Sequence, residues 1–384
     1  GAKGFAMKKS DRRIVVILRE TRLEKVLASQ NTLSQAKFYI RSLGSDFDEY
    51  EAEHQQYNAS VQVARQNLEG VGNLQMLDRK YLPNFIFAPE DIVVVIGQDG
   101  LVANTIKYLD HQPVIGVNPD ASRWDGVLLP FTPDDLPKIL RETLAGKRRI
   151  EAVSMARARI QNGQELLAVN DFFIGQRGHV SARYILKPGG LKEAQSSSGV
   201  IVSTGLGSTG WMKSVIAGAS RIANSVIGHP YGGGQENERV MEADEVADMA
   251  EVAISMESMT YGMDVPGAPA PEDREESRSM FSLRASKPLP ARKKTFGVSE
   301  LSGVIGKWHS RELLYAVREP FPSKTTGTNL VFGKISPDEP LRIESLMGEN
   351  GVIFSDGMES DFLAFNSGTE AVITLAEKQG RIVV

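Results

Sequence analysis

Apolar runs rich in β-branched residues alternate with amphipathic stretches through the first third of the chain. The runs at 13–19, 92–96 and 113–118 predict strands buried on both faces of a parallel sheet, and 85–87 predicts a short additional strand. Apolar residues at helical spacing predict helices at 32–43, 48–68, 101–109 and 134–144. This succession predicts a right-handed, mainly parallel α/β domain that ends near Gly146.

The pattern changes after Gly146, where short apolar runs recur at intervals set by turn residues. Such runs predict a β-rich, sandwich-like C-terminal domain. We expect its strands at 150–160, 166–169, 172–174, 180–186, 200–203, 313–317, 330–332, 341–343, 352–354, 361–365 and 371–375. One helix is predicted among them, from Trp211 to about Ile227.

The segment at about 229–307 differs in composition from the sequence on either side. Between 231 and 280 it has 13 Asp and Glu residues against 3 Lys and Arg, and it contains the proline-rich run 266–271. Such segments are usually insertions, although 242–259 is compatible with a helix. We therefore predict two domains, an α/β nucleotide-binding domain at 1–146 and a β-rich domain at 147–384 that carries this insertion.

Composition excludes several classes of function. The chain has 384 residues with a net charge of -4 and a pI near 5.9, which argue against nucleic acid or an anionic membrane as partner. It has no cysteine, its five histidines lack zinc-binding spacing, and no apolar run is long enough to span a bilayer. Residues 1–13 are basic but lack the apolar core of a signal peptide. We expect a globular protein of the cytoplasm.

A glycine-flanked acid, Gly97-Gln98-Asp99-Gly100, follows the strand predicted at 92–96 and precedes a helix. Open α/β sheets bind ligands at the carboxyl ends of their strands, and free helix amides there favour phosphate. The simpler interpretation is that Asp99 caps the helix, since Asp is a favoured capping residue.

A second glycine-rich stretch, Gly205-Leu206-Gly207-Ser208-Thr209-Gly210, follows a predicted strand and opens a helix. It fits the dinucleotide-binding pattern of dehydrogenases, but that pattern requires a second strand ending in an acid about 20 residues later. The chain instead continues into the sequence at 229–234, which is rich in glycine and cannot form that strand. This context argues against a dehydrogenase, and the absence of a P-loop motif excludes a P-loop enzyme.

Three stretches together resemble the motifs of the NAD kinases. The Gly-Gly-Asp-Gly-Thr motif of that family is matched by 97–101, its Asn-Glu or Asn-Asp pair by Asn170-Asp171, and its Thr-x-Thr-Gly-Ser motif by 204–208. Further stretches are similar to the mitochondrial-type branch, namely 113–118, 126–130, 169–175, 317–320 and 355–357. The resemblance runs in order from about residue 90 to the C-terminus, with 229–307 left out.

The resemblance implies an enzyme that transfers the γ-phosphoryl group of ATP to the 2′-hydroxyl of the adenosine ribose of NAD, with Mg²⁺. Asp99 would be the base that accepts the hydroxyl proton. The other implied binding residues are Gly97, Gly100, Asn170, Asp171, Thr204, Gly207 and Ser208. The glycines would let the backbone approach the phosphates closely. We expect no metal-ligating cluster of the protein's own and a homodimer or homotetramer.

Simpler roles and other functions stay open. Asn170-Asp171 fits a turn at a strand end, Thr204 and Ser208 fit helix caps, and Asp356-Gly357 fits a hairpin turn. A protein that binds a nucleotide as a sensor without turnover is one alternative, because Gln98 and Leu101 replace a glycine and a hydroxyl of the motif. A kinase acting on a sugar or lipid hydroxyl is another.

Overall fold

The computed structural model describes residues 11–123, 125–227 and 303–384. By their contacts, 11–219 and 303–384 form one compact unit, which contains both the parallel and the antiparallel strands.

The elements before Leu144 build an α/β lobe. In chain order they are β1 (Arg13–Leu18), α1 (Arg22–Gln30), α2 (Leu33–Ser42), α3 (Phe47–Leu68), β2 (Asn73–Asp78), the 3₁₀ helix η1 (Arg79–Asn84), β3 (Ile92–Ile96), α4 (Asp99–Ile106), β4 (Val114–Val117), the 3₁₀ helix η2 (Pro133–Asp135) and α5 (Leu136–Leu144).

The remaining elements are mostly strands. They are β5 (Ile150–Ile160), β6 (Glu165–Ala168), β7 (Asp171–Gln176), β8 (Ala182–Pro188), β9 (Glu193–Ser197), β10 (Val200–Ser203), the 3₁₀ helix η3 (Gly207–Thr209), α6 (Trp211–Ile227), β11 (Leu313–Val317), β12 (Phe332–Ile335), β13 (Leu341–Ser345), β14 (Gly351–Ser355), β15 (Met358–Ala364) and β16 (Glu370–Val383).

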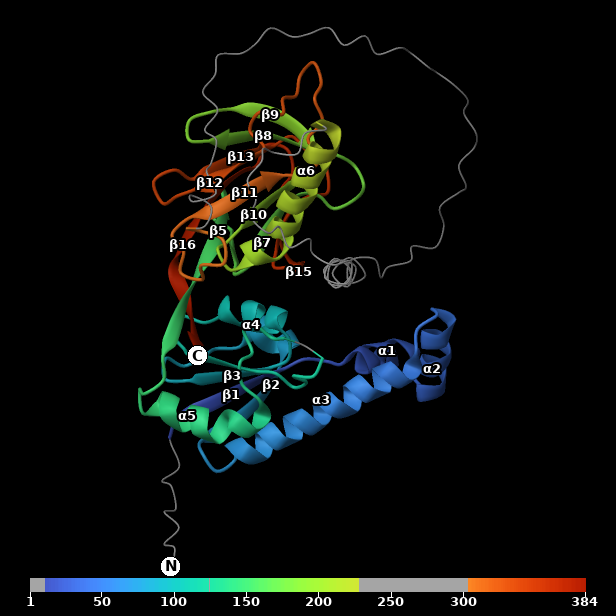
Figure 1. The fold of residues 1–384 in the computed structure, drawn as a ribbon, viewed down its shortest axis with the longest axis vertical. Coiled ribbons are helices and arrows are strands. Elements are labelled where there is room, and N and C mark those ends of the chain that lie inside the picture. Colours follow the sequence, from blue (N-terminus) through green and yellow to red (C-terminus); the bar gives the residue numbers. More distant parts are fainter. Residues whose placement is uncertain (1–10, 124, 228–302) are drawn as a thin grey trace, which may run out of the picture. The chain divides into compact units, whose positions relative to one another are not determined.

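The parallel strands of the α/β lobe lie in the order β2-β1-β3-β4. Helices α3 and α5 cover one face of this sheet and α4 covers the other (Figure 1). Because β1 connects to β2 on one side while β3 connects to β4 on the other, the strand order reverses between β1 and β3. Ligands of doubly wound sheets bind beside the carboxyl ends at such a reversal.

The prediction of a short strand at 85–87 was wrong. These residues have no strand pairing, and the neighbour of β1 is instead β2, whose sequence Asn73–Asp78 is only partly apolar. The physical reason is that β1 and β3 already have partners on both sides, so no sheet edge is free beside them. Phe85 and Phe87 pack edge to face with their ring centroids 4.7 Å apart.

The predicted β-rich, sandwich-like region is confirmed. An antiparallel sheet in the order β12-β11-β10-β7-β14-β15 packs through its inner face against β5, β6, β8, β13 and β16. Strand residues alternate between two faces, so the inward positions Phe172, Ile174, Val200 and Val202 are buried in this core.

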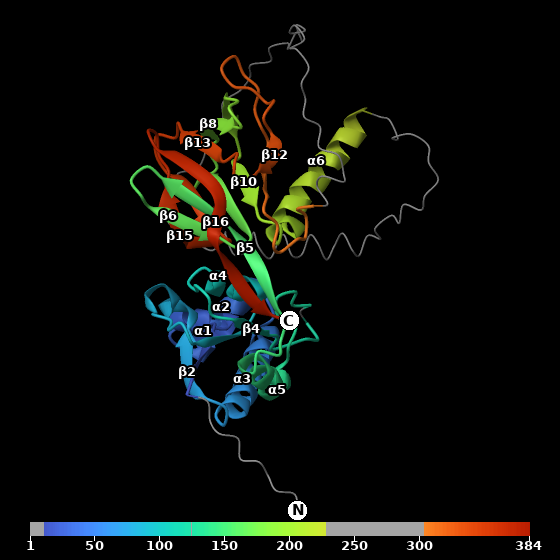
Figure 2. The same cartoon turned by 90° about the vertical axis from the view of Figure 1, so that its left-hand side faces the viewer.

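Strand β16 joins the two kinds of sheet. Its first residues, 370–373, pair antiparallel with β13, residues 371–383 run beside β5, and Ile382 near its end pairs in parallel with Val114 of β4 (Figure 2). One ten-stranded sheet therefore contains both the parallel and the antiparallel strands. The predicted boundary near 146 falls just before β5 and stays a prediction.

None of the helices within the described ranges is long and apolar enough to cross a membrane. The predicted helix at 242–259 lies outside the described residues.

The last residues of the segment predicted as an insertion contact the loop that follows β10. Val304 is fully buried, and the Gly306 N–H donates to the Gly205 carbonyl at 2.9 Å and to Ser208 Oγ at 3.1 Å. Residues 303–307 therefore support the loop at 205–208, while 229–302 lie outside the described residues.

We expect that a short Gly/Ser linker in place of 229–302 leaves the protein folded, because loop closure depends only weakly on length. Replacing 229–307 should lower the free energy of unfolding by roughly 2 kcal/mol or more relative to that variant, because Val304 and the two Gly306 hydrogen bonds are lost. Urea unfolding of both variants measures the difference. If the variant in which 229–302 is replaced no longer unfolds cooperatively, this segment belongs to the core.

Candidate functional site

Asp99 is the first residue of α4, directly after the turn that ends β3. The capping residue is Gln98, whose side chain makes no capping hydrogen bond. The two carboxylate oxygens of Asp99 instead accept the backbone N–H groups of Leu128 at 2.8 Å and Val127 at 3.1 Å. Asp99 therefore fixes the loop after β4 to the start of α4 rather than capping its own helix.

Burial raises the pKa of Asp99, and the nearby carboxylate of Asp125 raises it further, while the two backbone N–H groups lower it in part. A carboxylate with a raised pKa is a better proton acceptor at neutral pH. The position and the direction of this shift suit a general base, which stays a prediction.

The two glycines that flank Asp99 have different surroundings. A Cβ on Gly97 would lie 2.8 Å from Cδ2 of Leu101, which is too close, and 3.7 Å from Cδ of Arg19, which is an ordinary contact. A Cβ on Gly100 would meet no atom within 4 Å. A Cβ at Gly97 would therefore require the end of the Leu101 side chain to shift, whereas the space at Gly100 is open.

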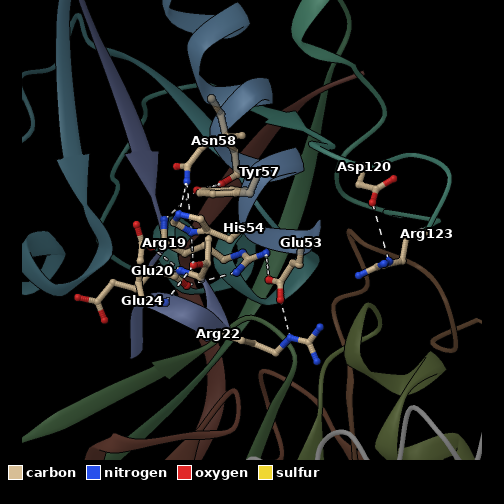
Figure 3. A network of polar contacts seen from close by, with 12 residues as sticks. Arg19, Glu20, Arg22, Glu24, Glu53, His54, Tyr57, Asn58, Asp120 and Arg123 are labelled. Carbon is tan, nitrogen blue, oxygen red and sulfur yellow. Dashed lines mark hydrogen bonds and ion pairs between the residues drawn. The ribbon is translucent and has the colours of Figure 1, made fainter. Parts of the chain in front are cut away.

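A network of ion pairs and hydrogen bonds that the sequence analysis missed lies at the carboxyl end of β1, beside Gly97 (Figure 3). Glu53 accepts hydrogen bonds from Arg19 at 2.9 Å and from Arg22 at 2.5 Å. The Tyr57 hydroxyl accepts the Arg19 N–H at 3.0 Å and donates to the Ile96 carbonyl at 2.9 Å. Tyr57 thus bridges the ends of β1 and β3, where the strand order reverses.

The second and third motifs come together through backbone contacts. The Thr204 N–H donates to the Asn170 carbonyl at 2.9 Å, and Thr204 Oγ1 donates to the Val169 carbonyl at 2.6 Å. A Cβ on Gly207 would lie 2.2 Å from the Asn170 oxygen. Glycine is therefore necessary at 207 for the two motifs to approach each other.

The hydroxyls of the third motif are already hydrogen-bonded within the protein. Thr204 Oγ1 accepts the Gly207 N–H at 3.1 Å, and Ser208 Oγ donates to the Gly205 carbonyl at 2.7 Å. Thr204 and Ser208 are both buried. In this structure they hold the loop before α6 in place, and their role as substrate contacts stays a prediction.

The Asp356-Gly357 turn does more than join β14 to β15. The Asp356 carboxylate accepts three successive backbone N–H groups, from Val169 at 3.0 Å, Asn170 at 2.6 Å and Asp171 at 3.2 Å. Both turn residues have positive φ, 52° at Asp356 and 67° at Gly357, as a tight hairpin turn requires. The sequence identified the turn but not its second function, which is to hold the Asn170–Asp171 loop.

Asp171 has an unusual carboxyl environment. Its Oδ1 is enclosed and has no hydrogen-bond partner among the described residues. Burial raises the pKa of Asp171 to about 7, with a contribution from the Asp356 carboxylate, and the Ser203 hydroxyl opposes the shift. Buried polar atoms nearly always have partners, so an unpaired one at a predicted binding residue is consistent with a partner supplied by a ligand.

One hydrophobic cluster connects the three motifs. Leu101 and Val102 of α4, Val169 before the second motif and Leu206 within the third all belong to it. Leu101 and Leu206 are buried, so the positions where the family motifs offer hydroxyls here provide apolar packing.

Within the described ranges, no three His, Cys, Asp or Glu side chains are grouped to hold a metal ion. Mg²⁺ in phosphoryl-transfer sites is held largely by substrate phosphates and by one or two carboxylates, so such a group is not needed for it.

No protein-family model matches the chain. A stretch of 158 residues is 32% identical to the NAD kinase of Aromatoleum aromaticum, which is 39% of this chain and 49% of that protein. The resemblance to the NAD kinase family is confirmed. The chain thus matches about half the length of this curated relative, and the mitochondrial-type branch stays a prediction.

Two solved structures are similar over most of the chain. An NAD kinase from Archaeoglobus fulgidus in complex with ATP has a TM-score of 0.47 and 15% identity, covering 97% of this chain and 93% of its own. Yeast NADH kinase complexed with NADH has a TM-score of 0.48 and 10% identity, covering 98% and 84%.

We expect the contribution of Asp171 to the stability of the protein to fall as pH rises from about 4 to about 7. Over this range the folded state keeps a proton on Asp171 that the unfolded state releases, at a cost of up to about 1.4 kcal/mol per pH unit. Asp171→Asn should remove this slope, so the free energy of unfolding of the variant relative to the wild type should be higher at pH 8 than at pH 5. Urea unfolding at both pH values measures it, and parallel pH profiles for the two proteins would contradict the assignment.

Proposed function

We propose that this protein transfers the γ-phosphoryl group of ATP to the 2′-hydroxyl of the adenosine ribose of NAD and so forms NADP. The observation that carries the proposal is that the second and third motifs are hydrogen-bonded to each other and share a hydrophobic cluster with the helix that Asp99 begins. The sequence similarity to an NAD kinase supports it independently.

In this proposal Asp99 accepts the proton of the 2′-hydroxyl as the bond to phosphorus forms. Asn170 and Asp171 bind the ribose and nicotinamide half of NAD, and a hydroxyl or amide donor of NAD would pair with the enclosed Oδ1 of Asp171. The start of α4 presents backbone N–H groups to the ATP phosphates. Mg²⁺, when bound, neutralises phosphate charge. Phosphoryl transfer depends mainly on such positioning and neutralisation, so few side chains are needed.

The proposal also includes a homodimer or homotetramer in the cytoplasm. The proposed assembly rests on the family resemblance, and the proposed location rests on composition. Size-exclusion chromatography with light scattering tests the assembly.

The second candidate is a protein that binds nucleotide without turnover. The observation that favours it is that Leu101 is buried and Gln98 places a side chain at the proposed phosphate edge. Incubation with NAD, ATP and Mg²⁺ tests both, because only the kinase produces NADP. If the protein binds NAD but forms no NADP, the nucleotide-binding sensor is favoured over the kinase.

We expect Asp99→Asn to lower kcat by about 10²- to 10⁴-fold, because an amide cannot accept the hydroxyl proton. The variant keeps one acceptor oxygen for the Leu128 N–H but cannot accept the Val127 N–H in the same way, so its unfolding must be measured alongside. Full turnover by a folded variant would remove Asp99 from the mechanism.

Asp125→Asn is the matched control. It removes a neighbouring charge that raises the pKa of Asp99 and leaves the two hydrogen bonds of Asp99 in place. Its kcat at pH 8 should stay near that of the wild type, while the acid limb of the pH profile should move to lower pH because Asp99 then ionises more readily.

We expect Gln98→Gly to lower the apparent KM for ATP and to leave the KM for NAD nearly unchanged. The Gln98 side chain makes no capping hydrogen bond, and Gly is an acceptable capping residue, so the helix should persist. Steady-state kinetics with each substrate varied in turn measure the two constants. An equal change in both would show that the phosphate site lies elsewhere.

A further inference from the structure

A buried lysine lies at the opposite end of the helix that Asp99 begins. Lys107 follows α4 as its C-terminal capping residue, and its side chain is only 4% exposed. Its Nζ donates to Asp361 Oδ2 at 2.6 Å and to Ser355 Oγ at 2.8 Å, and lies 3.5 Å from Asp356 Oδ2. A buried ammonium group requires such partners, because transfer from water is costly for an unpaired charge.

Two of the partners of Lys107, Ser355 at the end of β14 and Asp356 in the turn after it, hold the proposed NAD-binding loop and the strand before it. The Asp356 side chain is 1% exposed and accepts the N–H groups of Val169, Asn170 and Asp171. Ser355 Oγ in turn donates to the Leu167 carbonyl at 2.5 Å, on the strand that leads into this loop. Lys107 therefore contacts both Ser355 and Asp356, the residues from which hydrogen bonds reach the segment 167–171.

We infer that Lys107 is a positioning residue for the nucleotide acceptor: by fixing Asp356, it sets the Asn170–Asp171 loop relative to α4. The same helix then carries Asp99 at its start and controls the loop from its end. The inference rests on the proposed function, since it requires that this loop binds NAD.

Charge explains why a lysine is needed at this position. Asp356 is oriented by three backbone donors, which are neutral, so its charge is balanced within this cluster by Lys107. Asp361 shares the same ammonium group and is more exposed, with 26% of its side chain accessible. Without Lys107, two carboxylates would face each other beside the loop with no cation between them, and Asp356 would move toward water.

The test uses Lys107→Met, which keeps much of the length and apolar stem but removes the charge. The Kd of NAD, measured by calorimetry without ATP, and the KM for NAD should both rise by about 10- to 100-fold, because small displacements of binding groups have effects of this size. The KM for ATP should change less than about twofold. Lys107→Arg should restore part of the NAD affinity, because it restores the charge.

Lys378→Met is the matched control. Lys378 Nζ donates to the carbonyls of Lys107 and Leu109, at 3.0 and 3.1 Å, and so supports the same helix end without being bonded to Asp356. This variant should change thermal stability but leave the Kd of NAD near that of the wild type. If Lys107 only stabilised the fold, Lys107→Met would likewise change thermal stability and leave the Kd of NAD unchanged.

Asp356→Asn provides a second route if Lys107→Met does not fold. Asn tolerates the positive φ of this turn but cannot accept all three N–H groups with one oxygen. It should weaken NAD binding in the same direction. A folded Lys107→Met or Asp356→Asn with native Kd and KM for NAD would overturn the inference, whereas failure of the wild-type protein to bind NAD would overturn the proposed function.

Discussion

The antiparallel pairing of β5 with β16 is the constraint on which the rest of the structure depends. These strands pair from Ile160 with Ala371 to Ile150 with Val383, through an irregularity between Leu375 and Gln379. Because buried backbone N–H and C=O groups must be paired, this ladder cannot slide or separate without a large loss of hydrogen bonds. It fixes the parallel strands beside the sandwich, and thereby α4 beside the loops of the second and third motifs.

Within that frame, most polar groups of the candidate site are engaged in holding backbone. Asp99 holds the loop at 127–128, Asp356 holds the loop at 169–171, and Thr204 and Ser208 hold the turn before α6. Such preorganisation suits phosphoryl transfer, in which positioning contributes more than covalent chemistry. The enclosed Oδ1 of Asp171 remains as a group that a substrate could pair with.

The sequence predicted the buried strands well, because continuous apolar runs such as 92–96 have few other stable environments. It failed at the edge strand β2, which is only partly apolar, and at Phe85 and Phe87, whose aromatic side chains pack without joining the sheet. It also missed Arg19, Glu53, Lys107 and Asp361. These charged residues are scattered over about 340 positions and show no spacing pattern, and their pairing depends on how the strands are ordered in space.

The sequence by itself determined most of the buried strands and helices and the three glycine- and polar-rich motifs, since these depend on local apolar periodicity and turn chemistry. The tertiary structure alone decided that the last strand enters the first sheet, that Asp356 serves the Asn170–Asp171 loop, and that Lys107 contacts Asp356. These contacts join residues about 190 to 270 positions apart. Local propensity carries no information about such pairs, because they form only when distant segments bury their apolar faces together.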